Sequence, residues 1–365
     1  MKIGILTYHR ALNYGAFLQT LALKFFLEQQ GHEAEIIDYM PYNHAKAYYP
    51  FYISERMDKR NYGKVTLYNI LRLPKYMHRL RKMMRLQHKY LKLDTHIKYT
   101  DGEQLSNLNY DCVVYGSDQI WWRHSPIPSY SYFDGVFWGE YINENIKKVT
   151  YAPSMGLINL DDEDKQYIKN ALKRFSALSV RETTLKDVLQ PLTDKSITVV
   201  LDPVLLVGKE FWNQYATRRT PKQKYVLLYQ VMPSDEAVLF AKKKAKEMNC
   251  RYIELTAAVN PLKVGQRYIQ TADAFDMISL IKNAEFVVST SFHGLAFSIL
   301  FEKQFAVMGM KNNSGRAASL LAQLGLIDKL DSSNENIIDD YSTIREKLHN
   351  IQTQSKNFIM NALSE

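Results

Sequence analysis

The chain has 365 residues, of which 46% are hydrophobic and 23% are charged, with 15 glycines and 11 prolines. This composition is typical of a globular protein and excludes a disordered or collagen-like chain, and the length suits two domains of roughly 100–200 residues each. Cys112 and Cys250 lie far apart, which argues against a disulfide framework or a cysteine zinc site and favours a reducing compartment. No apolar run approaches the roughly 18 residues of a membrane span. The N-terminus turns polar at Tyr8, too early for a secretory signal. We therefore expect a soluble, cytoplasmic protein.

The net charge of +9 is concentrated in one segment. Between Glu55 and Lys92 there are twelve lysines and arginines against two acidic residues, so this stretch alone accounts for the excess of the whole chain. A basic segment with interleaved tyrosines could contact anionic lipid or nucleic acid, or it could form a solvated helical face. Because no nucleic-acid-binding motif is present, we favour a membrane surface over nucleic acid and expect it to be contacted through residues 56–92.

The first forty residues predict one βαβ unit. The apolar run 3–7 is typical of a buried strand, the spacing of apolar residues over 16–30 predicts a helix that Gly31 ends, and 35–39 predicts the next strand. Such units build parallel sheets with crossover helices. A basic, aromatic insertion then occupies about 41–100, with a helical stretch near 73–92.

The alternation of strands and helices returns after the insertion. Further strands are expected at 111–115, 148–152, 177–180 and 197–201, and a long aromatic loop lies between Trp121 and Ile146. After a polar linker at 217–222, a second series predicts strands at 225–230, 251–255, 285–289 and 305–308, with helices at 235–248, 272–283, 294–301 and 314–324. We predict two Rossmann-like α/β domains, 1–215 and 222–365, with a cleft between them. Ligands of such sheets bind at the carboxyl ends of the strands.

Several segments at predicted strand ends carry side chains suited to chemistry. Ser289–Gly294 joins a strand to a helix, where free backbone amides suit an anion, although a capped helix with a satisfied histidine explains it equally well. Asp118 is a candidate general acid or base, or a helix cap. Guanidinium groups bind phosphate or carboxylate, so Arg181, Lys311 and Arg316 are candidate anion ligands, although Arg181 could instead pair with Glu182 or another surface acid. Lys303 also follows this segment, but a solvated helix end explains it better.

Other site types receive little support. The first loop lacks the GxGxxG spacing of a dinucleotide site, so Asp38, placed like a ribose-binding carboxylate, is a weak candidate. No HExxH motif or histidine–cysteine cluster indicates a metal, and the Gly-x-Ser-x-Gly serine elbow is absent. The tyrosines and tryptophans of 121–141 either stack on a sugar face or form a hydrophobic lid.

Taken together, these segments resemble the polysaccharide pyruvyl transferase family. The resemblance runs in order from Met1 to about Leu326 and rests on Lys2–Thr7, Asn13–Ala16, Gly116–Trp121, Tyr151–Gly156, Ser179–Glu182, Leu201–Pro203, Ser289–Gly294 and Leu321–Leu326. It implies a two-domain fold similar to the GT-B glycosyltransferases. It also implies transfer of the enolpyruvyl carbons of phosphoenolpyruvate to two hydroxyls of a hexose, with release of phosphate and no other cofactor.

The resemblance also implies roles for particular residues. The family's histidine before glycine matches His293, and its strand-end arginine matches Arg181. Some members carry an arginine two positions before that histidine, where this chain has Ser291. We expect His293 and Asp118 to be catalytic, and we expect the donor to be bound by Arg181, Ser291, Gly294, Arg316 and Lys311. The acceptor is expected at Asn13, Tyr14, Trp121 and Trp122.

The acceptor is expected to be a surface polysaccharide, as in exopolysaccharide or capsule biosynthesis, or its lipid-linked precursor. In the second case the basic segment would hold the enzyme at the inner face of the membrane. Two alternatives remain: a nucleotide-sugar-dependent glycosyltransferase on the same type of fold, or a non-catalytic glycan-binding relative.

Overall fold

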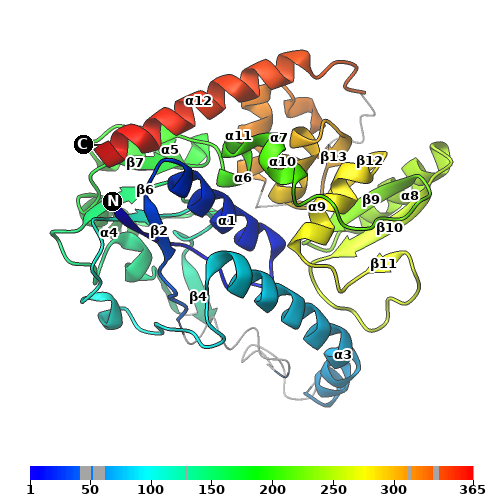
Figure 1. The fold of residues 1–365 in the computed structure, drawn as a ribbon, viewed down its shortest axis with the longest axis horizontal. Helices are drawn as coiled ribbons and strands as arrows, with labels where there is room; N and C mark the ends of the chain where they lie inside the picture. Colours follow the sequence, from blue (N-terminus) through cyan, green and yellow to red (C-terminus); the bar gives the residue numbers. More distant parts are fainter. Residues whose placement is uncertain (42–50, 52–61, 128–129, 311–313, 332–336, 365) are drawn as a thin grey trace.

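The computed structural model describes residues 1–41, 51, 62–127, 130–310, 314–331 and 337–364. Two parallel sheets, each with its helices, form two lobes (Figure 1). In the first lobe, β1 (Lys2–Leu6) and β3 (Cys112–Tyr115) lie at the centre, flanked by β2 (Glu33–Ile36) and β6 (Lys147–Thr150). β7 (Leu178–Val180) joins β6 through one bridge, Val149 to Ala177, and pairs with β8 (Ile197–Val199).

The second lobe contains a five-stranded parallel sheet. Its order is β11 (Tyr268–Ile269), β10 (Arg251–Thr256), β9 (Tyr225–Gln230), β12 (Phe286–Ser289) and β13 (Gln304–Val307). Every residue of β9 and β12 is buried, as expected for central strands that helices cover on both faces. Its helices include α8 (Asp235–Glu247), α9 (Ala274–Asn283), α10 (Phe292–Leu300) and α11 (Gly315–Leu324).

Helix α1 (Tyr14–Gln29) lies at the junction of the lobes. It is apolar around most of its circumference, and its residues from Tyr14 to Lys24 are buried, because it packs against α9 of the second lobe as well as α6 (Pro203–Leu206). Tyr14 and Phe17 share one core cluster with Tyr229 and Phe292. The core is therefore continuous across the junction.

The C-terminal helix α12 (Ser342–Ser364) connects the lobes a second time, running along one edge of the molecule toward the N-terminus (Figure 1). Ile344 and Leu348 pack with the second lobe's core, whereas Ile359 and Leu363 pack with Ile3 of the first sheet. The expected domain 222–365 placed this helix wholly in the second unit. Its contacts divide it between the two, because its apolar stripe is long enough to reach both cores.

The basic insertion forms a longer helix than predicted, α3 (Tyr62–Leu86), which a π-helical turn at Gln87–Leu91 extends. Two of its cations contact the body of the protein. Arg79 is 2% exposed and donates to Leu12 O at 2.8 Å in the first lobe and to the carbonyls of Thr256 and Ala257 in the second. Lys82 pairs with Asp276 and donates to Thr271 O. Part of the basic excess therefore connects the lobes, while residues 56–61 lie outside the described residues.

The aromatic loop is mostly a packed layer. It contains a short hairpin, β4 (His124–Ile127) and β5 (Tyr130–Tyr132), followed by a 3-10 turn at Gly135–Trp138. Trp121 and Trp138 are fully buried and stack with ring centroids 4.5 Å apart, and Trp121 Nε1 donates to Phe137 O.

The remaining elements cover the sheets. They are α4 (Asp162–Leu172), α5 (Thr183–Leu189), α7 (Gly208–Asn213) and 3-10 turns at Glu103–Leu105, Gln190–Leu192 and Ile327–Lys329. No helix among the described residues is long and apolar enough to cross a membrane.

Candidate active site

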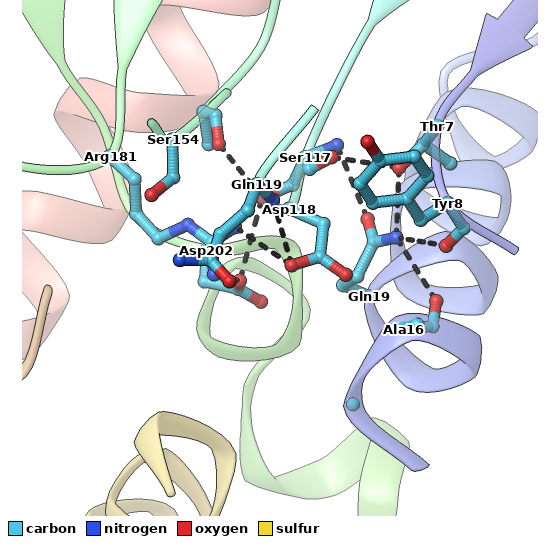
Figure 2. Close-up of polar contacts among 12 residues, drawn as sticks. Thr7, Tyr8, Ala16, Gln19, Ser117, Asp118, Gln119, Ser154, Arg181 and Asp202 are labelled. Carbon is cyan, nitrogen blue, oxygen red and sulfur yellow. Dashed lines mark hydrogen bonds and ion pairs between the residues drawn. The ribbon is translucent and has the colours of Figure 1, made fainter. Parts of the chain in front are cut away.

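Four ionisable side chains, each of which follows a different strand, meet where the lobes join. Arg181 follows β7, Asp202 follows β8, Asp118 follows β3, and His293 lies in the first turn of α10 after β12. Arg181 Nη1 lies 2.8 Å from Asp202 Oδ2, and Arg181 Nη2 lies 3.8 Å from Asp118 Oδ1 (Figure 2). His293 Nε2 lies 3.7 Å from the same Asp202 oxygen. The structure therefore brings the expected histidine and arginine to one carboxylate.

This group is excluded from solvent. Arg181 and His293 are each 4% exposed and Asp202 is 1% exposed. Burial alone would raise the pKa of Asp202, but the Arg181 guanidinium, the His293 imidazole and the Val204 amide lower it to about 2. Asp202 is consequently an anion at neutral pH that holds two basic side chains from two lobes.

Gly15 explains how the histidine reaches this position. A Cβ on Gly15 would lie 2.0 Å from His293 Nδ1, so only glycine lets the imidazole rest on the first turn of α1. Asn13 caps that turn by accepting from the Gly15 amide at 3.0 Å. The Asn-Tyr-Gly segment in the first loop therefore serves the contact between the lobes.

The Ser-Phe-His-Gly segment is shaped mainly by packing. A Cβ on Gly294 would lie 2.1 Å from Ser289 Oγ and 2.8 Å from a Tyr229 ring carbon, so this glycine permits close packing of α10 on its sheet. Ser291 is the N-cap residue of α10, makes no side-chain capping bond and is 8% exposed. Its amide donates to Ser289 Oγ at 3.0 Å.

Arg316 approaches from α11 and completes the cationic side of the junction. Its guanidinium lies 5.9 Å from the centre of the Phe292 ring, and that of Arg181 lies 5.3 Å from the same ring. Burial, together with the like charge of Arg181, lowers the pKa of Arg316. Among the described residues, Arg316 Nε and Arg181 Nε have no hydrogen-bond acceptor, and His293 Nε2 has only the Asp202 oxygen at 3.7 Å. Lys311 lies outside the described residues.

A cavity of about 320 Å³, which we call the first cavity, opens beside Asp118 in the first lobe. Asn13, Asp118, Gln119 and Trp122 line it, and Trp122 is 48% exposed. Tyr14 and Trp121, also expected at the acceptor, are fully buried and do not line it. The Tyr14 hydroxyl donates to Ala272 O at 3.0 Å, and burial raises the pKa of Tyr14 to about 12.

The backbone around Asp118 is held in an uncommon conformation. Asp118 has φ +75°, and Ala152 in the facing loop has φ +52°. Left-handed conformations of non-glycine residues cluster at functional sites. Asp118 O accepts from the Ser154 amide at 2.8 Å, and Ser117 is fixed by Thr7 and Gln19: its carbonyl accepts from Thr7 Oγ1 and its amide donates to Gln19 Oε1 (Figure 2). This network orients the Asp118 side chain between the cavity and Arg181.

Asp38 is fully occupied by structural partners. It accepts from both Nε and Nη2 of Arg10 and from the Lys98 amide, and it contacts His9 Nε2 at 2.9 Å. His9 Nδ1 lies 2.7 Å from the Thr7 carbonyl oxygen, so both ring nitrogens of His9 face oxygen atoms. The ribose-binding alternative for Asp38 is wrong, because the carboxylate is used to position His9 and Arg10 in the cavity wall.

Sequence reasoning missed the central residue of this site, Asp202. Asp202 lies in a Leu-Asp-Pro segment directly after a predicted strand, and that position could have marked it as a candidate site residue. Nothing in the sequence indicated that it would face His293. Gln19, which accepts from the Ser117 amide, was also missed, because it lies in a helix of mostly apolar residues. Among the described residues, no group of three or more histidine, cysteine or acidic side chains is arranged to hold a metal.

The family model for polysaccharide pyruvyl transferase matches residues 13–312. The chain belongs to the polysaccharide pyruvyl transferase family. The match includes all the residues that meet at the junction except those of α11, and it confirms the resemblance in the sequence. Comparison with curated protein sequences finds no match.

Solved structures show what the fold resembles. The UDP-GlcNAc 2-epimerase of Neisseria meningitidis is 9% identical, with a TM-score of 0.50, and the alignment covers 100% of this chain and 99% of that chain. A glycosyltransferase from Rickettsia africae is 14% identical, with a TM-score of 0.44 and coverage of 99% and 93%. The expected α/β fold of two Rossmann-like lobes, similar to the GT-B fold, is confirmed.

Proposed function

We propose that this protein is a ketal pyruvyl transferase that uses phosphoenolpyruvate as donor and two hydroxyls of a hexose as acceptor. The observation that supports it best is the set of buried donors at the lobe junction. Arg181 Nε and Arg316 Nε lack acceptors among the described residues, and an unsatisfied buried donor costs about 1–3 kcal/mol. A small donor that carries both phosphate and carboxylate would supply the missing acceptors.

The proposed reaction assigns one role to each side chain. His293 protonates the methylene carbon of phosphoenolpyruvate, and Arg181 and Arg316 hold its two anionic groups. The two hydroxyl oxygens form bonds to the central carbon, and the bond from that carbon to the phosphate oxygen breaks. One hydroxyl proton replaces the proton that His293 gives, and the other leaves with phosphate. Asp118 accepts one of these two hydroxyl protons as the hydroxyl oxygen attacks the central carbon.

The acceptor is proposed to occupy the first cavity. Asp118 lies between that cavity and Arg181, so a hydroxyl beside its carboxylate is directed toward the proposed donor position. Asn13 and the exposed ring of Trp122 are the proposed acceptor contacts. Because Tyr14 and Trp121 are buried behind this wall, we propose that they support it.

Entry of the donor requires a change at the junction. Arg181, Asp202 and His293 are buried and paired with one another, so phosphoenolpyruvate reaches them only when the lobes separate. The lobes are linked by the core that α1 shares with α9 and α10, by the polar contacts of Arg79 and by the two halves of α12, so the proposed separation also has to open the core contacts of α1.

For a lipid-linked acceptor, we propose that α3 also faces an anionic membrane. Leu67 and Leu71 are more than half exposed, and Arg81 and Arg85 are exposed further along the helix. Reversing both arginines should weaken flotation with anionic liposomes, whereas K242E/K246E, an exposed pair of the same spacing on α8, should not. Equal flotation of both variants would leave α3 as a solvated face.

The experiment that tests the proposed activity measures both products. The protein is incubated with phosphoenolpyruvate and a panel of synthetic and lipid-linked galactosides, phosphate is measured, and the sugars are examined by mass spectrometry for an added pyruvate. UDP- and CMP-sugars replace phosphoenolpyruvate in parallel reactions. Sugar transfer from a nucleotide donor without pyruvylation would favour the glycosyltransferase, and glycan binding without any reaction would favour the non-catalytic relative.

A further inference from the structure

A second cavity, of about 360 Å³, adjoins the first one in the first lobe. Tyr39 and Pro41 line both cavities, so the two share a wall. The second cavity is otherwise formed by the turn at 100–102 and by the segment from Tyr132 to Tyr141. Asp118 lines only the first cavity.

Aromatic rings and carboxylates form the lining. Tyr39, Phe133 and Tyr141 contribute rings, and Asp101 and Asp134 contribute carboxyl groups. No lysine or arginine is among the described residues that line it. This lining disfavours an anion such as a phosphate or a lipid headgroup. Flat apolar faces beside hydrogen-bond acceptors suit a neutral sugar, which presents one apolar face and a rim of hydroxyl donors.

Tyr141 is positioned for contact with a ligand. The residue is 45% exposed, and its backbone is left-handed, with φ +66°. Its ring rests on Gly102, where a Cβ would lie 2.6 Å from the ring carbon Cδ2. A glycine and a strained backbone thus hold an exposed aromatic ring in one orientation at the mouth of a cavity.

The opposite wall is fixed by hydrogen bonds. The Tyr39 hydroxyl donates to Asp134 Oδ2 at 3.0 Å, and the Val136 amide donates to Asp134 Oδ1 at 3.1 Å. Asp101 Oδ1 accepts from the Glu103 amide at 2.9 Å and orients its carboxylate at the edge of the cavity. The tyrosine shared by the two cavities is therefore anchored to a residue of the second one.

We infer that the second cavity is a binding subsite for the sugar residue that neighbours the modified hexose, so that the enzyme recognises at least a disaccharide unit of its acceptor. This inference rests on the proposed placement of the modified hexose in the first cavity. Tyr141 supplies the stacking surface, and Asp101 accepts hydroxyl hydrogen bonds. The subsite selects chain length and linkage, and it takes no part in the transfer itself.

The test is a binding measurement that requires no phosphoenolpyruvate. An array of synthetic mono-, di- and trisaccharides in matched series is probed with the full-length chain. For the terminal sugar that binds best, we expect the disaccharide to be retained about three- to tenfold more tightly than the monosaccharide. Equal retention of the two, or no retention of any glycan, would overturn the subsite.

Substitutions test which residues provide the tighter binding of the disaccharide. Y141A should lose the advantage of the disaccharide and keep monosaccharide binding, and Y141F, which keeps the ring, should retain it. G102A should also lose it, because the new methyl group displaces the Tyr141 ring. Y62A, which removes an exposed tyrosine on α3, is the matched control. A disaccharide advantage that survives in Y141A and G102A would refute the inference. Phosphate release reports separately on the proposed reaction.

Discussion

The lobe junction and the two cavities beside it place similar side chains in different environments. At the junction, Arg181, Asp202 and His293 are buried and engage one another across two lobes. In the cavities, Asp118, Trp122 and Tyr141 come from one lobe and are accessible. In the proposed function, the junction holds a small ionic donor that replaces internal pairs, and the cavities hold a larger neutral ligand that binds a preformed surface.

Two carboxyl groups illustrate the contrast. Asp202 is surrounded by Arg181 and His293, which lower its pKa to about 2 in spite of burial. Asp134 is also removed from solvent, but no cation of the described residues compensates: burial raises its pKa to about 6, and the Tyr39 hydroxyl and the Val136 amide offset this only in part. A buried carboxyl thus takes its charge state from its partners.

The largest expected effect is on the rate, from His293→Ala. Loss of the proposed acid should lower phosphate release from phosphoenolpyruvate with a suitable acceptor by about 10²- to 10⁴-fold. The measurement is the initial rate of phosphate release, with the midpoint of thermal unfolding recorded to confirm folding. A rate equal to that of the unchanged protein would remove His293 from the mechanism.

Arg181→Met should have the largest effect on stability, because it leaves the Asp202 carboxylate buried without its closest partner. The expected loss in the free energy of unfolding is about 3–5 kcal/mol, measured in urea. The double variant R181M/D202N should recover much of this loss, because the stranded charge is then absent. Losses that simply add in the double variant would show that the two side chains do not act as a pair.

Gly15→Ala tests the contact between α1 and His293. The new Cβ would overlap the imidazole, so the free energy of unfolding should fall by about 1–3 kcal/mol. Gly63→Ala on α3 is the matched control, since its added Cβ meets no other part of the described chain within 4 Å and alanine favours a helix. If the two substitutions have the same effect, the histidine does not rest on Gly15.

The smallest expected effect concerns pH and the second cavity. The raised pKa of Asp134 means that the folded state holds this proton more tightly than the unfolded state. Ionisation therefore costs stability as the pH rises from about 4 to above 6. Relative to D134N, the unchanged protein should lose on the order of 1–2 kcal/mol between pH 4 and pH 7, measured by urea unfolding. A difference in the free energy of unfolding between the two proteins that does not change with pH would contradict the buried environment assigned to Asp134.

Much of the fold was predictable because buried parallel strands are short apolar runs. The strand at 225–230 has the predicted bounds, and helices α8 to α11 begin and end within two residues of the predicted ones. Helices α4, α5 and α12 were missed. Their apolar residues are sparse among charged ones, and α12 is distinguished only by packing with both lobes.

The site was predictable where a residue follows a strand and not where its role depends on a distant contact. Asp118, Arg181 and His293 were found from their positions, and the structure brings them together around Asp202. Tyr14 and Trp121 were chosen because they are aromatic residues in candidate loops. Only the three-dimensional packing distinguishes these buried rings from Trp122, which is exposed.

The most direct test of the donor assignment is a calorimetric titration of the protein with phosphoenolpyruvate, repeated with UDP and with the variant R316M. We predict saturable binding of phosphoenolpyruvate at one site, no binding of UDP, and at least tenfold weaker phosphoenolpyruvate binding in R316M, since a hydrogen bond to a charged group is worth about 1.5–3 kcal/mol. Binding of UDP without binding of phosphoenolpyruvate, or unchanged affinity in R316M, would contradict the proposal that the lobe junction holds a small donor with a phosphate and a carboxylate.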